Sequence, residues 1–185
     1  MQKVLGYMRK AIQEFDLIED SDIIGVGVSG GKDSLVLLRG LYLLQRFIGI
    51  DYKLIAITLD PQFNGVQGDY SEVQRLCDKM GIEYILKRTQ IGQIVFDVRK
   101  EEHPCSLCAR MRRGALHDAA KEAGCNKIAL GHHRDDVVET FMMNLEIEGR
   151  IGCFSPKSYL SRKDITMIRP LVLSPEKAIH HAANT

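Results

Sequence analysis

Cysteine is scarce in this sequence, and long apolar runs are missing. Its 185 residues include five cysteines, an odd number, and only Cys105 and Cys108 lie close together. This argues against a disulfide framework and for reduced thiols. No run is apolar enough over sufficient length to span a bilayer, and the amphipathic residues 1–15 are unlike a signal peptide. We therefore expect a cytoplasmic protein that has no membrane partner.

Net charge is also almost absent. The chain has 25 Lys and Arg against 24 Asp and Glu, which gives a formal net charge of +1. Any nucleic-acid site must therefore be a local basic patch rather than a property of the whole chain. Apolar residues make up 45% and charged residues 26%, the balance of an ordinary globular protein. With no internal repeat or linker, we expect one domain over residues 1–185.

Hydrophobic periodicity predicts that strands and helices alternate along the chain. We expect strands at 22–28, 52–60, 82–88, 127–131 and 165–171. We expect an amino-terminal helix at 2–17, followed by helices at 34–47, 69–80, 106–123 and 134–147. This alternation indicates an α/β fold, a five-stranded parallel sheet with helices on both faces. Ligands of such sheets bind beyond the carboxyl ends of the strands, so we expect the site in the loops after residues 28, 59 and 131.

The first of these loops has the sequence SGGKDS, which is Ser29, Gly30, Gly31, Lys32, Asp33 and Ser34. Its glycines let the backbone turn and approach a ligand, and the free N–H groups at the helix start favour an anion. The lysine adds positive charge, and the serines add hydroxyl donors. A turn capped only for packing has no use for this lysine, so phosphate is the predicted ligand. The aspartate would repel phosphate, which predicts Mg²⁺ beside it.

Three kinds of phosphate loop are distinguishable here. The Walker A pattern fails, because Val26 and Asp33 stand where it requires glycine and Ser or Thr. The dinucleotide pattern G-x-G-x-x-G is met by Gly25, Gly27 and Gly30, although the first two lie inside the predicted strand. An oxidoreductase that binds a dinucleotide therefore remains an alternative. The SGGKDS sequence itself resembles the pyrophosphate loop of the N-type ATP pyrophosphatases, which adenylate a substrate and release pyrophosphate.

The second motif is PCSLCARMRRG, at the start of a predicted helix. Cys105 and Cys108 are three residues apart, which puts both sulfurs on one side of the first turn. They are candidates for binding zinc or an iron–sulfur cluster, or for transferring sulfur. The alternative is that they are simply two buried thiols. Arg110, Arg112 and Arg113 follow. This helix is predicted to present positive charge to phosphates, with a solvated basic face as the alternative.

The third motif is GHHRDD, which follows the fourth predicted strand. His132 and His133 come at its carboxyl end, and Asp135 and Asp136 open the next helix. Capping and packing explain each of them singly. Beside a phosphate loop, they predict a catalytic and metal-orienting edge. Asp60 closes the second strand at the same edge of the sheet.

Together, SGGKDS, PCSLCARMRRG, KIALGHHRDD and IRPL, in this order, resemble the TtcA/TtuA-type tRNA thiolation enzymes, and most of all those that make 2-thiocytidine. The resemblance implies an adenine nucleotide α-hydrolase-like, Rossmann-like PP-loop fold. It also implies that ATP adenylates C2 of a cytidine in the tRNA anticodon loop and that sulfur then displaces AMP. The implied partners are tRNA, ATP and a sulfur donor, either sulfide or a cysteine desulfurase system. A homodimer is left open.

The resemblance also implies roles for single residues. The six residues of SGGKDS match the phosphate site, and Asp33, Arg112 and Asp136 match catalytic positions. Asp60 and His132 are expected to contact the nucleotide because they lie at the same edge.

A [4Fe–4S] cluster is implied on Cys105, Cys108 and a third cysteine downstream of the last strand. Cys77, Cys125 and Cys153 do not match that position. We therefore expect this chain to be shorter at its carboxyl end than the family pattern, without the third ligand.

Two further alternatives remain. A lysidine-forming ligase or an amidotransferase-type synthetase would share SGGxDS, but these enzymes generally lack PCxxC followed by RxRRG. The alternative from another functional class is a non-catalytic RNA-binding fragment that a bound metal stabilises, and the missing third cysteine supports it.

Overall fold

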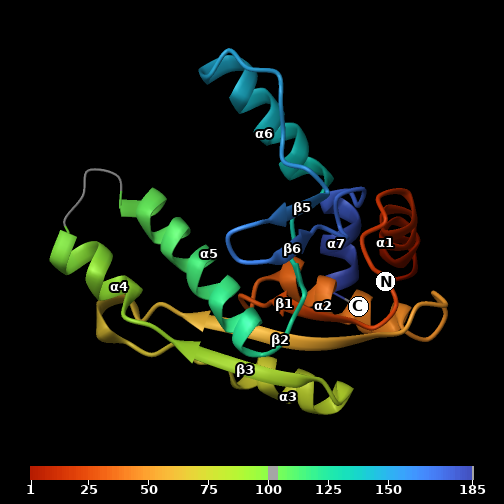
Figure 1. Cartoon of the computed structure of the whole chain (residues 1–185), viewed down its shortest axis with the longest axis horizontal. Helices are drawn as coiled ribbons and strands as arrows, with labels where there is room; N and C mark the ends of the chain where they lie inside the picture. The colour runs from red at the N-terminus through yellow and green to blue at the C-terminus, as the bar shows by residue number, and fades with distance from the viewer. Residues whose placement is uncertain (100–103, 185) are drawn as a thin grey trace.

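A computed structural model describes residues 1–99 and 104–184 of the chain (Figure 1). In these residues, six strands form one sheet in the order β3-β2-β1-β4-β6-β5. The parallel strands are β1 (Asp22–Gly27), β2 (Tyr52–Asp60), β3 (Glu83–Arg88), β4 (Lys127–Ala129) and β6 (Ile165–Ile168). The edge strand β5 (Lys157–Leu160) runs antiparallel to β6. The five predicted strands are thus the five parallel ones.

The expected number of strands was wrong, because β5 was not predicted. Its four residues, KSYL, are half-buried or exposed and carry no apolar run, so the sequence gives no strand signal there. Pairing with β6 defines the strand instead, with Lys157 opposite Ile168 and Leu160 opposite Ile165. An antiparallel edge strand on a parallel sheet leaves the predicted fold class intact.

Each predicted helix is present, with ends that differ by at most three residues. The observed bounds are α1 (Gln2–Glu14), α2 (Lys32–Leu44), α3 (Ser71–Met80), α5 (Pro104–Glu122) and α6 (Arg134–Ile147). Four elements were not predicted: η1 (Phe63–Gly65), α4 (Ile91–Gln93), a π-helix η2 (Ile94–Arg99) and α7 (Glu176–Ala183). Among the described helices, none has the length and apolar character needed to cross a membrane.

Helices cover both faces of the sheet, as expected. On one face, α1, α2, α3 and α7 pack over a core that includes Met8, Leu41 and Ile179, with Ile24 and Val26 of β1 beneath them. On the other face, α5 packs on a smaller core. Successive side chains of a strand point to opposite faces, so one strand serves both cores. Each large side chain buried in this way contributes roughly 1.5–3 kcal/mol.

Candidate nucleotide and thiol site at the carboxyl edge of the sheet

The SGGKDS loop joins β1 to α2 and is closed by its own serines. Gly30 has φ +83°, a conformation that L side chains rarely adopt, and a Cβ added there would meet nothing within 4 Å. Ser34 Oγ donates to Gly31 O (2.8 Å) and accepts from Ser29 N (3.2 Å). These hydrogen bonds therefore hold the loop at the amino end of α2 in a defined conformation, and the space beside Gly30 is open.

Lys32 is held by two carboxylates. Its Nζ lies 2.9 Å from Oε1 of Glu176 and 3.1 Å from Oδ1 of Asp33. The hydrogen bonds to Glu176 and then to Asp33 raise the pKa of Lys32 above its usual value, so the ammonium stays charged. Glu176 opens α7 and was not predicted as a site residue. An acidic residue in the first turn of a helix is ordinary, so the sequence alone gave no signal.

The loop after β4 lies directly on the start of α2. A Cβ on Gly131 would lie 3.3 Å from the Asp33 carbonyl carbon and from Ser34 N. Any larger residue at this position would therefore require the neighbouring backbone to shift. His132 follows, and its Nδ1 is buried without a partner in the described chain. Burial, and next the charge of Arg169, lower the pKa of His132 below its usual value. His132 is therefore a neutral group at the site.

The remaining residues of the third motif connect two helix starts. His133 N donates to Oδ2 of Asp136 (2.7 Å), and Asp136 N donates to Nδ1 of His133 (3.4 Å), which forms a capping box for α6. Asp135 Oδ2 accepts from Glu176 N (2.7 Å) at the start of α7. Asp136 thus helps to cap α6, and Asp135 holds the start of α7. The catalytic role of Asp136 stays a prediction.

Asp60 is buried at the end of β2, where it holds the following loop. Its Oδ1 accepts from Gln62 N and its Oδ2 from Gly68 N, each at 3.0 Å. With Ser29 and Arg112, it lines a hollow of about 300 Å³. The structure brings Asp60 to the predicted edge, and its contact with a nucleotide stays a prediction.

A second cavity, of about 310 Å³, lies between the strand ends and α5. Its wall is mainly apolar and includes Val28, Ile57, Leu59, Leu116 and Leu130, while its polar members are Ser29, Arg112, Arg113 and His132. An apolar cleft with a few polar groups suits a planar base. Ser29 belongs both to this cavity and to the phosphate loop, so the two adjoin each other.

Gly25 and Gly27 serve the packing of α5. Both lie inside β1, and a Cβ on Gly25 would meet Ala120 Cβ of α5 at 3.3 Å, while one on Gly27 would meet Leu116 Cδ2 of α5 at 3.1 Å. Neither glycine lies in the turn where a dinucleotide pyrophosphate would bind. This removes the observation on which the oxidoreductase alternative depended.

Cys105 and Cys108 occupy the first turns of α5. Cys105 is exposed, whereas Cys108 is buried among Ile91, Val95 and Leu107. The next residue after Cys108, Ala109, lines the cavity under α5. Helix α5 thus carries the cysteine pair and also lines this cavity. This supports the prediction that the pair lies near the nucleotide edge.

The other three cysteines lie elsewhere. Cys77 and Cys125 are buried in the two cores, and burial raises the pKa of each thiol to about 11, so both remain protonated. Cys153 is exposed, with its Sγ 3.3 Å from the Val137 carbonyl. Residues 1–99 and 104–184 contain no group of three or more His, Cys, Asp or Glu side chains that could hold a metal. Among these residues, Cys105 and Cys108 therefore belong to no such group, and their role as ligands of a cluster stays a prediction.

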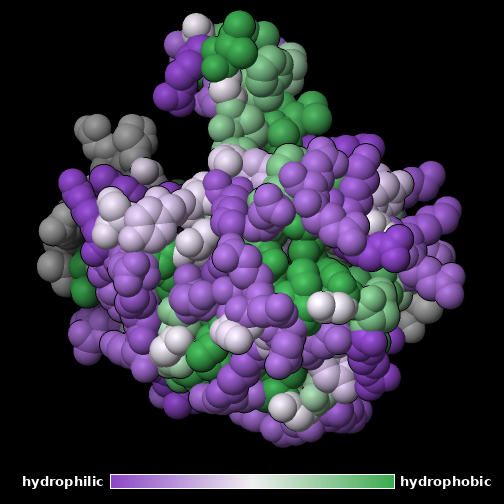
Figure 2. All heavy atoms as spheres, turned by 45° about the vertical axis from the view of Figure 1, so that its right-hand side comes forward, coloured by the Kyte–Doolittle hydropathy of each residue, from purple (hydrophilic) through white to green (hydrophobic). Residues whose placement is uncertain are grey.

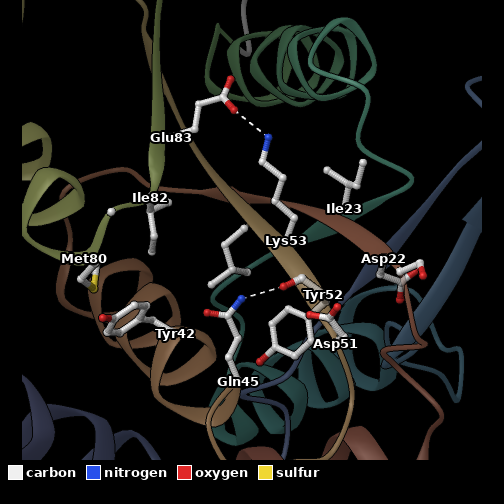
Figure 3. A pocket seen from close by; sticks show the side chains of 13 residues that line it. Asp22, Ile23, Tyr42, Gln45, Asp51, Tyr52, Lys53, Met80, Ile82 and Glu83 are labelled. Carbon is white, nitrogen blue, oxygen red and sulfur yellow. Dashed lines mark hydrogen bonds and ion pairs between the residues drawn. The ribbon is translucent and has the colours of Figure 1, made fainter.

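A separate hollow of about 600 Å³ lies at the opposite edge of the sheet, near the amino ends of β1 and β2 (Figure 3). Two pairs of its polar groups bind each other: Lys53 pairs with Glu83 at 2.9 Å, and Gln45 Nε2 donates to Tyr52 O at 2.6 Å. Nothing there indicates a ligand, and all of the predicted nucleotide-site residues lie at the other edge.

Comparison with known proteins identifies the family. A family model described as a PP-loop domain matches residues 5–185. This chain belongs to the PP-loop family. Similar curated proteins are tRNA-cytidine(32) 2-sulfurtransferases, one from Citrifermentans bemidjiense (40% identical over 96% of this chain) and one from Ralstonia nicotianae (43% over 92%). The family resemblance inferred from the motifs is confirmed.

Solved structures agree with this assignment. A U34-tRNA thiolase from Methanococcus maripaludis, solved with its [4Fe–4S] cluster, has a TM-score of 0.78 and 28% identity over 99% of this chain. An NH3-dependent NAD synthetase from Campylobacter jejuni, with a TM-score of 0.57 and 19% identity, covers 99% of this chain and shares the fold. This chain spans 69% and 54% of the two sulfurtransferases and 62% of the thiolase.

Proposed function

We propose that residues 1–185 form one PP-loop domain that catalyses ATP-dependent sulfur transfer to C2 of a cytidine in a tRNA anticodon loop. The observation that carries this proposal is the arrangement on α5. Its first turns bear the cysteine pair, and its next turns cover the cavity that Ser29 shares with the phosphate loop. Two curated relatives are named for this reaction at cytidine 32.

The first half of the proposed reaction uses the phosphate loop. The adenine base fits the apolar cavity under α5, and the phosphates lie on the N–H groups at the start of α2 with Lys32 beside them. Asp33 is placed to orient Mg²⁺, which would neutralise charge on the leaving pyrophosphate. The C2 oxygen of the cytidine then attacks the α-phosphorus. Pyrophosphate departs, and the base is left activated as an adenylate.

The second half replaces that oxygen by sulfur. Cys105 and Cys108 supply two thiolates for a [4Fe–4S] cluster, which would present the incoming sulfur when bound. Sulfur adds at C2, the C2–O bond breaks, and AMP leaves with the oxygen. The sulfur donor, whether sulfide or a cysteine desulfurase system, belongs to this proposal, as do Mg²⁺ and the cytoplasmic location.

The proposed tRNA surface is the exposed face of α5. Arg110, Arg112 and Arg113 are all exposed on it, and two of them line the cavity. Phosphate contacts position a nucleic acid without reading its sequence. A local patch of this kind accounts for tRNA binding by a chain with a net charge of only +1.

The test separates adenylation from sulfur transfer. The anaerobically purified protein is incubated with ATP, Mg²⁺, sulfide and unmodified tRNA, and both pyrophosphate release and 2-thiocytidine are measured. Lys32→Ala should abolish both, and Cys105→Ala should abolish thiolation alone. Lys53→Ala is the matched control, because Lys53 also pairs with a glutamate but lies at the opposite edge.

Two outcomes would contradict the proposal. Pyrophosphate release that is undiminished in Lys32→Ala would show that the loop does not serve ATP. Binding of tRNA without any pyrophosphate release, in the wild type, would favour the non-catalytic RNA-binding alternative.

A further inference from the structure

The hollow that Asp60 lines adjoins the cavity under α5. The Asp60 hollow has a volume of about 300 Å³, and the cavity has one of about 310 Å³. Three residues, Ser29, Leu59 and Arg112, line both. In the proposed function, the adenine of ATP fits the cavity under α5. The Asp60 hollow, beside the same phosphate loop, therefore remains for a second ligand.

Apolar side chains line the Asp60 hollow where they are open to solvent. Phe63 is 43% and Val66 is 68% exposed, and Tyr70 is half-buried. Figure 2 shows apolar side chains scattered among hydrophilic ones over the body of the molecule, so exposure alone does not mark a site. These three differ because they share one hollow with the buried carboxylate of Asp60 and with Arg112. Such a mixture suits a nucleobase, which stacks on aromatic rings and forms hydrogen bonds at its edge.

The loop that carries Phe63 is held in place from two sides. Gly92 N of α4 donates to Pro61 O (2.8 Å), and a Cβ on Gly92 would lie only 2.9 Å from Phe63 Cα. The carboxylate of Asp60 accepts two backbone N–H groups of the same loop, each at 3.0 Å. Two non-glycine residues of the loop have φ of +50° and +54°, a strained conformation that persists where surrounding contacts impose it. The aromatic ring is thus presented by a preorganised loop, which lowers the entropic cost of binding.

The Asp60 hollow also lies between the two chemical centres of the proposed reaction. On one side is Ser29 of the phosphate loop. On the other is α5, where Cys108 precedes Arg112 by four residues, a spacing that places both on one face of the helix. Helix α4 and the following η2 lie between the end of β2 and the start of α5 (Figure 1). Phe63 pairs with Phe96 of η2, with ring centroids 5.8 Å apart, and η2 also packs on Cys108.

This position favours the target base over adenine as the ligand. The base that is first adenylated and then thiolated has to meet both the phosphate loop and the cysteine pair. Adenine has to meet only the phosphate loop.

We propose that the Asp60 hollow receives the base of the target cytidine, turned out of the anticodon loop, with Phe63 as its stacking platform. This inference rests on the proposed function and names the substrate subsite of the same reaction. Enzymes that modify a base take it out of its stack and hold it against aromatic side chains. Arg112, at the wall that the two hollows share, is placed for a phosphate of the RNA. Phe63 is then a binding residue for RNA that has no part in ATP binding.

The test is a double-mutant cycle between Phe63 and the base. Two anticodon stem-loop RNAs are used, one with cytidine at position 32 and one that lacks only the base at that position. Phe63→Leu keeps an apolar side chain but removes the aromatic face. It should weaken binding of the intact RNA roughly 5- to 150-fold, the range for one stacked base, as measured by fluorescence anisotropy. The wild type and Phe63→Leu should bind the abasic RNA equally.

Two control variants separate stacking from other effects. Phe63→Tyr keeps the ring and should bind the intact RNA as the wild type does. Phe47→Leu changes another exposed phenylalanine (55%), beyond the far end of α2, and should also match the wild type. Phe63 belongs to none of the three described cores, so its variants should unfold at the temperature of the wild type. The Kd for ATP and Mg²⁺ should be equal in all four proteins.

Three results would overturn the inference. A weaker Kd for ATP in Phe63→Leu would assign the Asp60 hollow to adenine. An equal loss of affinity for both RNAs would show that Phe63 contacts another nucleotide, and an unchanged affinity for the intact RNA would show that no base stacks on it. Pyrophosphate release by the wild type with the intact RNA is measured alongside. Its absence would overturn the proposed reaction instead, and with it the role of the bound base as the target.

Discussion

Gly30→Ala separates backbone strain from ligand contact in the phosphate loop. Gly30 has φ +83°, and a Cβ added there would meet no protein atom within 4 Å. The only cost to the free protein is therefore the left-handed conformation, about 1–2 kcal/mol. For a chain of this size, that lowers Tm by roughly 2–8 °C.

The effect on ATP binding has a different origin. Strain that is present in both the free and the bound protein cancels in Kd. The new methyl group, however, occupies the open space that phosphate would enter above the loop. Loss of one charge-assisted hydrogen bond costs about 1.5–3 kcal/mol, which corresponds to a roughly 10- to 150-fold weaker Kd. Isothermal titration with ATP and Mg²⁺ measures it directly.

Gly81→Ala is the matched control for this experiment. Gly81 ends α3 with φ +65°, and a Cβ there would also meet nothing within 4 Å. It should show a similar loss of Tm and an unchanged Kd. If Gly30→Ala binds ATP as tightly as Gly81→Ala does, phosphate does not approach the loop at Gly30, and the assignment of the phosphate site is wrong.

Three further predictions concern the same edge of the sheet. Glu176→Gln should tighten ATP binding, because Lys32 no longer has to leave the carboxylate of Glu176 to contact phosphate. The control is Glu72→Gln, which removes another acidic residue in a first helical turn. Weaker binding in Glu176→Gln would instead mean that Glu176 contacts the ligand or its metal. The pKa of His132 is lowered in the folded protein, so the unfolded chain binds the proton more readily and the free energy of unfolding should fall as pH drops through 6.5. In urea unfolding, the free energy of His132→Gln should depend less steeply on pH than that of the wild type. An equal pH dependence in the two proteins would refute this prediction. Arg112→Ala should weaken tRNA binding and reduce its log–log salt slope by about 1, while the exposed Arg39→Ala should have no effect.

Local patterns in the sequence were sufficient for much of the fold. Each of the five parallel strands has its own apolar run, and each of the five long helices has its own periodicity, so both were predictable without contacts. The ends were less certain because a helix end depends on a few weak bonds. Strand β5 was missed for a physical reason: its residues are half-exposed at the edge of the sheet, and its identity comes from pairing with β6.

The same division applies to the candidate site. The sequence by itself determined the phosphate loop and the cysteine pair, because short spacings on a turn or a helix start fix their geometry locally. Only the tertiary structure placed Glu176 on Lys32, across 144 residues, and Gly131 against the start of α2. Within the described residues, it also left Val138, Phe141, Met142 and Leu145 of α6 exposed or half-exposed, although the same spacing predicts a helix whether or not another element covers it. Periodicity reports which face of a helix is apolar, and only packing decides what meets that face.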